Sequence, residues 1–452
     1  MAEVAVFLLV GATLLGFGFV ASRNRLGAWR DAARSCGLQI VEASAGLRPH
    51  LRARSGLVSV RMEMCGDKGT VTRITVAAPA PPEFHSVTIR PESSLELGRE
   101  IEIGDRNFDD AFHIQGPPRL VLALLDAETR RLLADLKEKG RILIFSGELR
   151  AVVSGDEKVA PVLSLLLAVQ KRFAPDVLRR LAENATQDPE PGVRLQNLLL
   201  LIRELSWSPV TDEALRKACS DPVPEIRLRA AKQLGGAEGH GVLLELAESL
   251  EDDDVSAEAL TALDRELPFE RLNAILRLAM RRRRLMSARV CLEAIGRRGA
   301  AAGVDLLAKV LEREQGELAP AAARALGAIG SPAAEAALVE ALQREDAEVR
   351  VAAATALGRA GTVAAVPPLK EAVERSRLDR DLHRAARQAI AEIQSRLQGA
   401  SPGQLSLAGG EAGQLSLAQD GGELSFADDP AGRLSLGGDE NPENKARGTT
   451  GS

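Results

Sequence analysis

The hydrophobic pattern begins with an uncharged run from Val4 to Ser22. A helix of that length rises about 28 Å, close to the roughly 30 Å hydrocarbon core of a bilayer. Arginines follow the run at Arg23 and Arg25, so the positive-inside rule keeps the C-terminal side in the cytoplasm. A secretory signal peptide is the alternative, but it needs Lys or Arg ahead of the apolar run, where neither occurs. We therefore predict an uncleaved transmembrane anchor over residues 1–25, with its N-terminus outside.

Alternating apolar and polar residues, punctuated by Gly and Pro, characterise residues 26–155. This alternation predicts half-buried antiparallel strands. A hairpin with its turn near Ser146 and Gly147 closes the segment. The strands are predicted at 38–43, 57–64, 69–78, 85–91 and 100–105, after a short amphipathic helix that carries Trp29, Ala32, Ala33 and Cys36 on one face. We expect an α+β domain of about six to eight strands with two or three helices, and its role is not indicated.

Residues 156–398 have helix-forming composition and repeat themselves. Leu326 and Leu357 occupy equivalent positions in successive units, and the stretches DPEPGVRLQNLLLL and DPVPEIRLRAAKQL share their opening. The series continues upstream at Ile295, Leu263 and Leu234. Each unit contains two amphipathic helices, with Asp346 placed to cap the first helix of the last unit. Because no such pair buries its apolar stripe alone, about six to seven units must stack as a solenoid.

The unit DAEVRVAAATALGRAGTVAAVPPLKEAV resembles the short HEAT repeats that also occur in phycobilisome lyases. The resemblance covers a little over half of the chain and weakens between Glu251 and Arg284, and with the predicted anchor it points to a bacterial membrane-anchored HEAT-repeat protein. The resemblance implies an α-solenoid, and repeats of this kind serve as scaffolds far more often than as enzymes. Together with the predicted anchor, it implies a single-pass protein of the bacterial inner membrane with the bulk of the chain in the cytoplasm.

The predicted tail, residues 399–452, repeats one short motif four times. The motif is Gly, any residue, Leu, Ser, then Leu or Phe, and the spacers are polar and rich in glycine. That composition predicts disorder. An extended triplet places two apolar side chains on one face, which suits a weak motif repeated for avidity. Expansion of a neutral linker is the alternative. The candidate binding residues are Leu405, Leu407, Leu415, Leu417, Leu424, Phe426, Leu434 and Leu436.

The net charge and the cysteine spacing argue against a nucleic-acid binder, a disulfide framework and a zinc site. The formal net charge is −5, and the tail alone contains eight acidic and three basic residues, so the rest of the chain is neutral. A neutral body offers no global field to attract nucleic acid. The four cysteines are far apart, without the spacing of a disulfide framework or a zinc site. Scattered thiols of this kind suit a reducing compartment.

One acidic stretch, GDRNFDDAFHIQG, could be a metal or acid–base site. It places Asp105, Asp109 and Asp110 beside His113, but it lacks the alternating ligands of a calcium loop. We therefore expect its aspartates to cap and turn the chain while its phenylalanines enter the core. The sequence also lacks phosphate-binding, hydrolase and metalloprotease motifs. We predict no catalytic, cofactor-binding or metal-binding residues and no cofactor.

A run of arginines is the one concentrated basic feature of the chain: Arg281, Arg282, Arg283 and Arg284. These side chains could contact phosphates of nucleic acid or of a membrane surface. Successive helical residues are turned by about 100°, however, so four in a row cannot share one face. We expect a solvated helix end.

These observations favour a membrane-anchored, non-catalytic scaffold that binds protein partners through its repeat surface and its multivalent tail. Nucleic acid is not an expected partner. The anchor helix could pair with a second copy through its small residues Ala12 and Gly16. The alternatives are a lyase-like enzyme acting on a tetrapyrrole-like ligand, and a nucleic-acid binder that uses Arg281 to Arg284.

Overall fold

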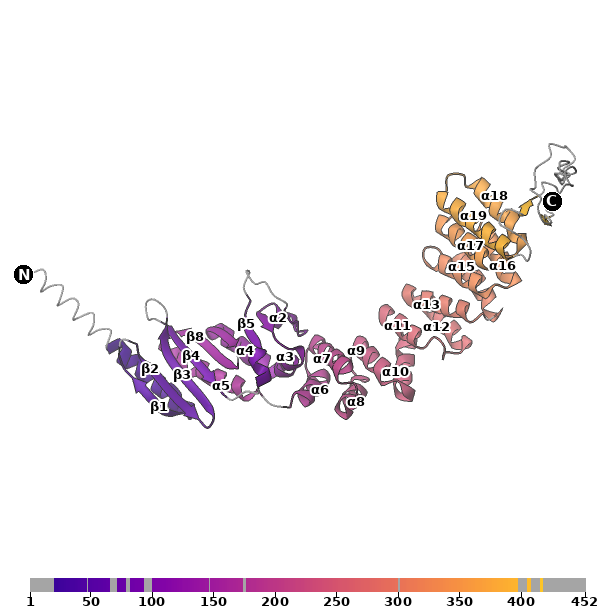
Figure 1. Ribbon diagram of the computed structural model, residues 1–452. Coiled ribbons are helices and arrows are strands. Elements are labelled where there is room, and N and C mark those ends of the chain that lie inside the picture. The colour runs from indigo at the N-terminus through magenta and orange to yellow at the C-terminus, as the bar shows by residue number, and fades with distance from the viewer. Residues whose placement is uncertain are drawn as a thin grey trace, which may run out of the picture. The chain divides into compact units, whose positions relative to one another are not determined.

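The computed structural model in Figure 1 describes most of the chain between residues 20 and 396 and two short strands beyond it. The described residues are 20–46, 48–65, 71–78, 82–92, 100–145, 147–173, 176–299, 301–396, 405–407 and 415–417. The chain divides into two compact units, residues 1–242 and 243–452. Each unit is described by itself.

The first unit contains an antiparallel sheet of eight strands in the order β1-β2-β3-β4-β8-β7-β5-β6. The strands are β1 (Gln39–Ser44), β2 (His50–Ser55), β3 (Val58–Cys65), β4 (Val71–Ala77), β5 (Thr88–Pro91), β6 (Phe112–Gln115), β7 (Arg141–Phe145) and β8 (Glu148–Ser154). The predicted α+β architecture of this segment is present, including the β7–β8 hairpin.

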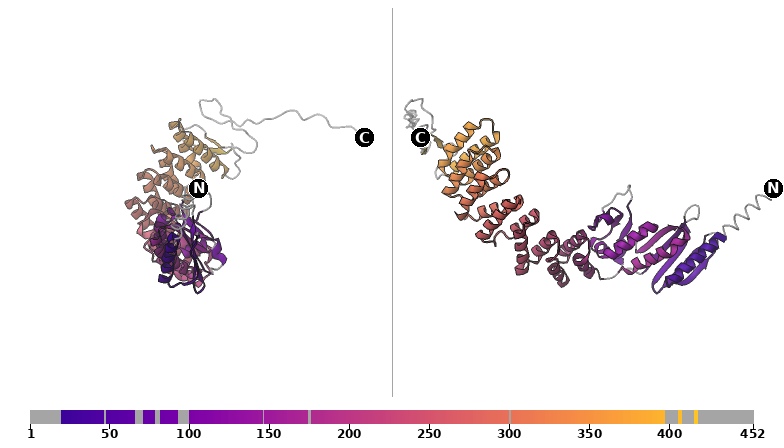
Figure 2. Two further views of the ribbon diagram at one scale, coloured as in Figure 1. Left: turned by 90° about the vertical axis from the view of Figure 1, so that its left-hand side faces the viewer. Right: turned by 180° about the vertical axis from the view of Figure 1, so that it is seen from behind.

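One face of the sheet is covered by helices, which lie together in the right-hand view of Figure 2. The alternation along β3 and β4 turns Met62 and Ile74 inward, where both are fully buried. They share one core with Leu26 and Trp29 of the helix over residues 20–35. Helix α5 (Val159–Lys171) packs on β4 and β8. The opposite face of these strands stays open to solvent.

The prediction of an N-terminal transmembrane helix, and with it a single-pass inner-membrane location, is wrong for the described chain. No helix among the described residues is both long and apolar enough to cross a bilayer. The helix over residues 20–35 carries several arginines and uses its apolar face, including Leu26 and Trp29, to cover the sheet. The greater part of the predicted anchor, residues 1–19, lies outside the described residues.

Three strand assignments also differ from prediction. Residues 100–105 form no strand, although the Ile101 amide donates to the Ile114 carbonyl at 3.0 Å. Strands β2 and β6 were not predicted. Strand β2 alternates as strands do, but its solvent-facing positions are arginines and its buried ones only Leu51 and Ala53, so the apolar signal is weak.

Short helices connect the sheet to the first repeats. Helix α3 packs against α6 and α7, and the hydrophobic core runs continuously from Leu26 to Ala230. The helices of this part are α2 (Arg106–Asp109), α3 (Pro118–Leu124), α4 (Ala127–Lys139), α6 (Val177–Gln187), α7 (Pro191–Glu204), α8 (Pro209–Ala218) and α9 (Pro224–Leu234). Helix α10 (Gly236–Ser249) contains the division between the units.

Residues 253–395 of the second unit form a helical array of two-helix repeats, as predicted. Helices α11, α13, α15, α17 and α19 stack in one layer, each on the next, as Figures 1 and 2 show for its upper end. The helices are α11 (Asp253–Ala262), α12 (Phe269–Arg282), α13 (Leu285–Arg297), α14 (Val304–Arg313), α15 (Leu318–Ile329), α16 (Pro332–Ala341), α17 (Ala347–Ala360), α18 (Val366–Arg375) and α19 (Arg380–Ser395). The predicted cap is confirmed, because Asp346 accepts hydrogen bonds from the amides of Glu348 and Val349.

Tight stacking in this layer depends on glycine facing alanine once per repeat. A Cβ on Gly327 of α15 would lie 2.7 Å from the Cβ of Ala356 on α17. The same contact recurs between Gly296 and Ala325, and between Gly358 and Ala389. Because real Cβ atoms do not approach other heavy atoms this closely, only glycine allows the helices to lie at this separation.

Replacing Gly327 with Ala tests this packing. Alanine normally stabilises a helix interior by about 1 kcal/mol relative to glycine, but overpacking against Ala356 costs about 1–3 kcal/mol. We expect a net loss of unfolding free energy in denaturant melts. Gly241→Ala in α10 is the matched control, because a Cβ there meets nothing within 4 Å, and it should stabilise the protein. A stabilising Gly327→Ala would refute the close-packing account.

Candidate interaction surface

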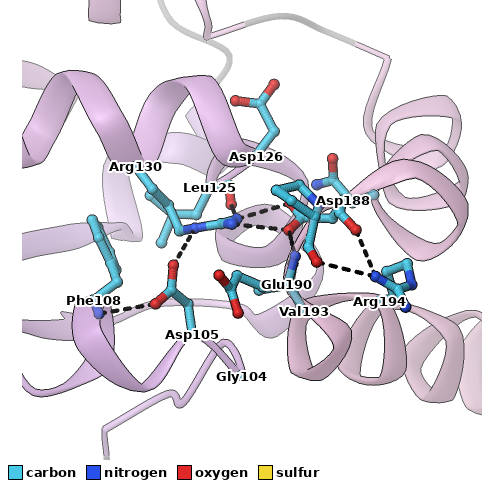
Figure 3. A network of polar contacts seen from close by, with 12 residues as sticks. Gly104, Asp105, Phe108, Leu125, Asp126, Arg130, Asp188, Glu190, Val193 and Arg194 are labelled. Atoms are coloured by element: carbon cyan, nitrogen blue, oxygen red, sulfur yellow. Dashed lines mark hydrogen bonds and ion pairs between the residues drawn. The ribbon is translucent and has the colours of Figure 1, made fainter. Parts of the chain in front are cut away.

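A buried arginine joins the sheet to the first repeat (Figure 3). The Arg130 side chain, on α4, is 6% exposed. Its Nε donates to Asp105 Oδ2 at 2.8 Å, and its Nη1 donates to the Leu125 carbonyl at 2.9 Å. Both Nη atoms bond the carboxylate of Asp188, which is 1% exposed, at 2.9 Å each. Burial lowers the pKa of Arg130, but the hydrogen bonds and charges of Asp188 and Asp105 outweigh it and raise the pKa above its usual value.

The network continues into the next repeat through Arg194. Its Nη1 donates to the Asp188 carbonyl. Its Nε and Nη2 donate to the two carboxylate oxygens of Asp221 at 2.7 and 3.0 Å. Beside it, Gly104 and Gly192 touch through their backbones, so a Cβ on either would clash with the other. Each arginine and aspartate of this network contacts a side chain of opposite charge. We call this buried network the joint between the sheet and the first repeats.

The acidic stretch that sequence reasoning weighed as a site has the structural role that was expected. Asp105 caps α2 by accepting from the Phe108 amide, and Asp109 accepts from the amides of Ile103 and Gly104. Phe108 stacks on Phe112 with ring centroids 4.5 Å apart. Burial is the main cause that raises the pKa of Asp109.

His113 belongs to a different group, which sequence reasoning missed. Its Nδ1 lies 3.8 Å from a carboxylate oxygen of Glu92 and 3.8 Å from one of Glu100. Burial first, and then the charge of Glu92, raise the pKa of Glu100. The three side chains are close enough to hold a metal ion. Both glutamates are more than a third exposed, and exposed acidic groups often lie together in this way without a metal ion.

Three of the cysteine thiols have pKa values raised above the ordinary value. Burial raises the pKa of Cys291 to about 12. Burial also raises the pKa values of Cys36 and Cys219. A protonated thiol is a poor nucleophile and a poor metal ligand, and Cys291 is also fully buried, whereas Cys36 and Cys219 are half-buried.

A groove of about 560 Å³ crosses the stacked helices α15, α17 and α19. Its lining includes small residues such as Ala352 and Ala385, and Glu348 and Arg384 bring charges of both signs. It is lined by Pro320, Arg324, Ala347, Glu348, Val351, Ala352, Thr355, Asp379, Asp381, Arg384, Ala385 and Gln388. A segment bound in this groove would contact small apolar side chains and charged groups of both signs.

Asp379, one of the residues that line this groove, forms an ion pair with Arg350. Asp379 caps α19 by accepting from the Leu382 amide and receives Arg350 Nη2 at 2.9 Å. The Leu382 hydrogen bond, followed by Arg350, lowers the pKa of Asp379 despite some burial. The lowered pKa favours the ionised carboxylate. Its bond to Arg350 links α17 to the start of α19 beside the groove.

The predicted basic patch is divided between two helices. Arg281 and Arg282 end α12, Arg283 adopts a left-handed conformation with φ of 55°, and Arg284 precedes α13. Arg282 donates to the Ser249 carbonyl at 2.6 Å and Arg284 to the Glu251 carbonyl at 2.9 Å. These arginines bind carbonyls of the preceding repeat, as Arg298 does at Leu267. The four do not form one surface.

The tail residues are described only in part. Strands β9 (Leu405–Leu407) and β10 (Leu415–Leu417) cover the first two motif copies and pair antiparallel. Their register places Leu415 opposite Leu407 and Ser416 opposite Ser406. The later candidates Leu424, Phe426, Leu434 and Leu436 lie outside the described residues.

The stacked two-helix units of the second unit define an α-solenoid. More narrowly, residues 304–391 match HEAT repeats. Human deoxyhypusine hydroxylase in complex with glycerol is similar at 17% identity over 48% of this chain and 96% of its own, with a TM-score of 0.22. An engineered protein is similar at 23% identity over 50% and 91%, with a TM-score of 0.21. Neither likeness bears on function. No curated protein matches the chain.

Replacing Arg130 with Ala tests the buried joint. The change leaves Asp188 as a buried, uncompensated charge, and removing one partner of such a pair costs about 3–5 kcal/mol. Denaturant melts should show this loss. Arg131→Ala is the matched control one residue away, because Arg131 pairs with Glu128 in solvent, and it should change stability little. Arg130→Met combined with Asp188→Leu should recover part of the loss, and equal effects at Arg130 and Arg131 would contradict the joint.

Proposed function

We propose that the protein is a non-catalytic scaffold that binds protein partners along its HEAT repeats. The groove across α15, α17 and α19 is the observation that supports this proposal. Its volume is typical of sites that hold a ligand or part of one, and its mixture of small apolar and charged side chains suits a helix or an extended segment of a protein. Stacked repeats commonly present such extended surfaces.

The contacts of the basic run favour a protein partner over nucleic acid. A nucleic-acid site needs guanidinium groups free to neutralise phosphates. Arg282 and Arg284 instead donate to backbone carbonyls of Ser249 and Glu251. The groove itself includes no aromatic side chain on which a base could stack.

The repeated tail motif adds avidity to this proposed scaffold. One triplet contributes little binding energy, but several copies on one chain raise the effective concentration of each for a partner with several sites. The antiparallel pairing of the first two copies shows that the triplet takes up extended backbone. An extended triplet can add to an exposed sheet edge of a partner.

Arginines introduced into the groove test the proposed partner surface. Thr355→Arg with Ala385→Arg fills the groove with bulk and charge, so partners cross-linked to the full chain and identified by mass spectrometry should fall by about tenfold or more. Ala333→Arg with Ala336→Arg on α16, outside the groove, is the matched control and should capture the same partners as the parent. Equal capture by all three proteins would argue against the groove.

A fourfold tail variant tests avidity separately. Changing Leu405, Leu415, Leu424 and Leu434 to Ser should abolish tail-dependent capture, whereas each single change should weaken it only modestly, because the remaining copies still bind. Affinity measured for the parent, the single variants and the fourfold variant distinguishes these cases. A fourfold variant that keeps every partner at parental affinity identifies the tail as a linker.

A further inference from the structure

The open face of the sheet carries a row of arginines. Strand register places Arg52 of β2 directly opposite Arg61 of β3, and Thr75 of β4 lies between Arg61 and Arg150 of β8. This face is opposite to the one that Leu51, Met62 and Ile74 turn into the core. Like charges directly across strands destabilise a sheet. At the directly opposed pair Arg52 and Arg61, an anion bound at Arg61 would therefore reduce the repulsion.

Some of these arginines have acidic neighbours and some do not. Arg52 pairs with Glu42 at 3.3 Å, Arg73 with Glu63 at 3.1 Å, and Arg150 with Glu148. In the part of the chain that the structure describes, Arg54 and Arg61 form no ion pair or side-chain hydrogen bond. Both line a hollow of about 520 Å³ on this face, together with Arg52, Arg73 and Arg150.

The two unpaired arginines are diagonal neighbours. Arg54 lies opposite Ser59, and Arg61 is two residues farther along β3. Diagonal positions of this kind are about 7–8 Å apart. Side chains at alternate positions of an extended peptide are about 6.8 Å apart. Two carboxylates at alternate positions of such a peptide can therefore each meet one guanidinium, whose fork of donors suits a carboxylate.

Two features of the hollow distinguish among anions. Glu63 and Glu148 in its lining are paired with Arg73 and Arg150. The unpaired positive charge of the lining is therefore confined to Arg54 and Arg61, which suits two spaced carboxylates better than the closely spaced charges of a phosphate chain. The lining residues include no aromatic side chain, so a nucleic acid would gain no base stacking. An acidic peptide with spaced charges avoids both problems.

We propose that the open face of the sheet binds an extended acidic peptide of a partner protein, with carboxylates at alternate positions held by Arg54 and Arg61. This surface is separate from the groove on the helical repeats, and it stands or falls independently of it. Bound carboxylates neutralise the unpaired charges of Arg54 and Arg61, while Arg52, opposite Arg61, is already paired with Glu42.

Fluorescence anisotropy with the full chain tests the proposal. The probe is a short labelled peptide in which Glu alternates with Gly, and a peptide of the same composition with contiguous glutamates serves as comparison. The alternating peptide should bind more tightly, and raising the salt from about 50 to 200 mM should weaken binding. Arg54→Gln with Arg61→Gln should weaken it by about tenfold or more. Arg359→Gln with Arg377→Gln, at exposed sites on the helical repeats, removes the same charge and should leave binding unchanged.

Circular dichroism and thermal melts establish that each variant is folded, and the single variants Arg54→Gln and Arg61→Gln should each lose part of the affinity. Unchanged binding by the double variant overturns the proposal, as does equal loss in the control. Inorganic polyphosphate or single-stranded RNA that binds the parent more tightly than the alternating peptide, and loses that affinity in the double variant, overturns the assignment to a peptide.

Discussion

The buried guanidinium of Arg130 is the contact on which the first unit depends. It bonds Asp105 before α2, the carbonyl that ends α3, and Asp188 before α7. Asp105 and Asp188 come from segments far from Arg130 in sequence, and the side chains of Arg130 and Asp188 are almost fully removed from water. Burying an arginine is tolerable only when its donors are matched. The sheet and the first repeats also share one continuous hydrophobic core within one compact unit.

Periodicity predicted the elements whose neighbours lie close in sequence. Strands β3 and β4 alternate β-branched and polar residues, and the last repeats show a clear helical stripe with Asp346 at the cap, so both were predicted. Strand β2 was missed because its inward positions are only Leu51 and Ala53, which give too weak an apolar signal. The uncharged N-terminal run was assigned to a bilayer, and composition alone could not show that the helix beginning at residue 20 covers the sheet.

The candidate sites were less predictable because tertiary contacts create them. The groove combines Arg324, Ala352 and Ala385 from three different repeats, and no local motif marks such a set. Arg130 and Asp188 are 58 residues apart, and each looks like an ordinary surface residue in its own segment. Conversely, Arg281 to Arg284 looked like one patch only because they are adjacent in the chain, while helix geometry and backbone carbonyls disperse them.

The facing glycines and alanines of the last repeats give the second unit a bending stiffness that depends on direction. On the layer of α13, α15, α17 and α19, atoms already touch at Gly296, Gly327 and Gly358, so compression there meets hard repulsion. Extension of the same layer only separates weak dispersion contacts. The groove lies on this layer. Spreading of the helices on this face would therefore meet less resistance than their compression.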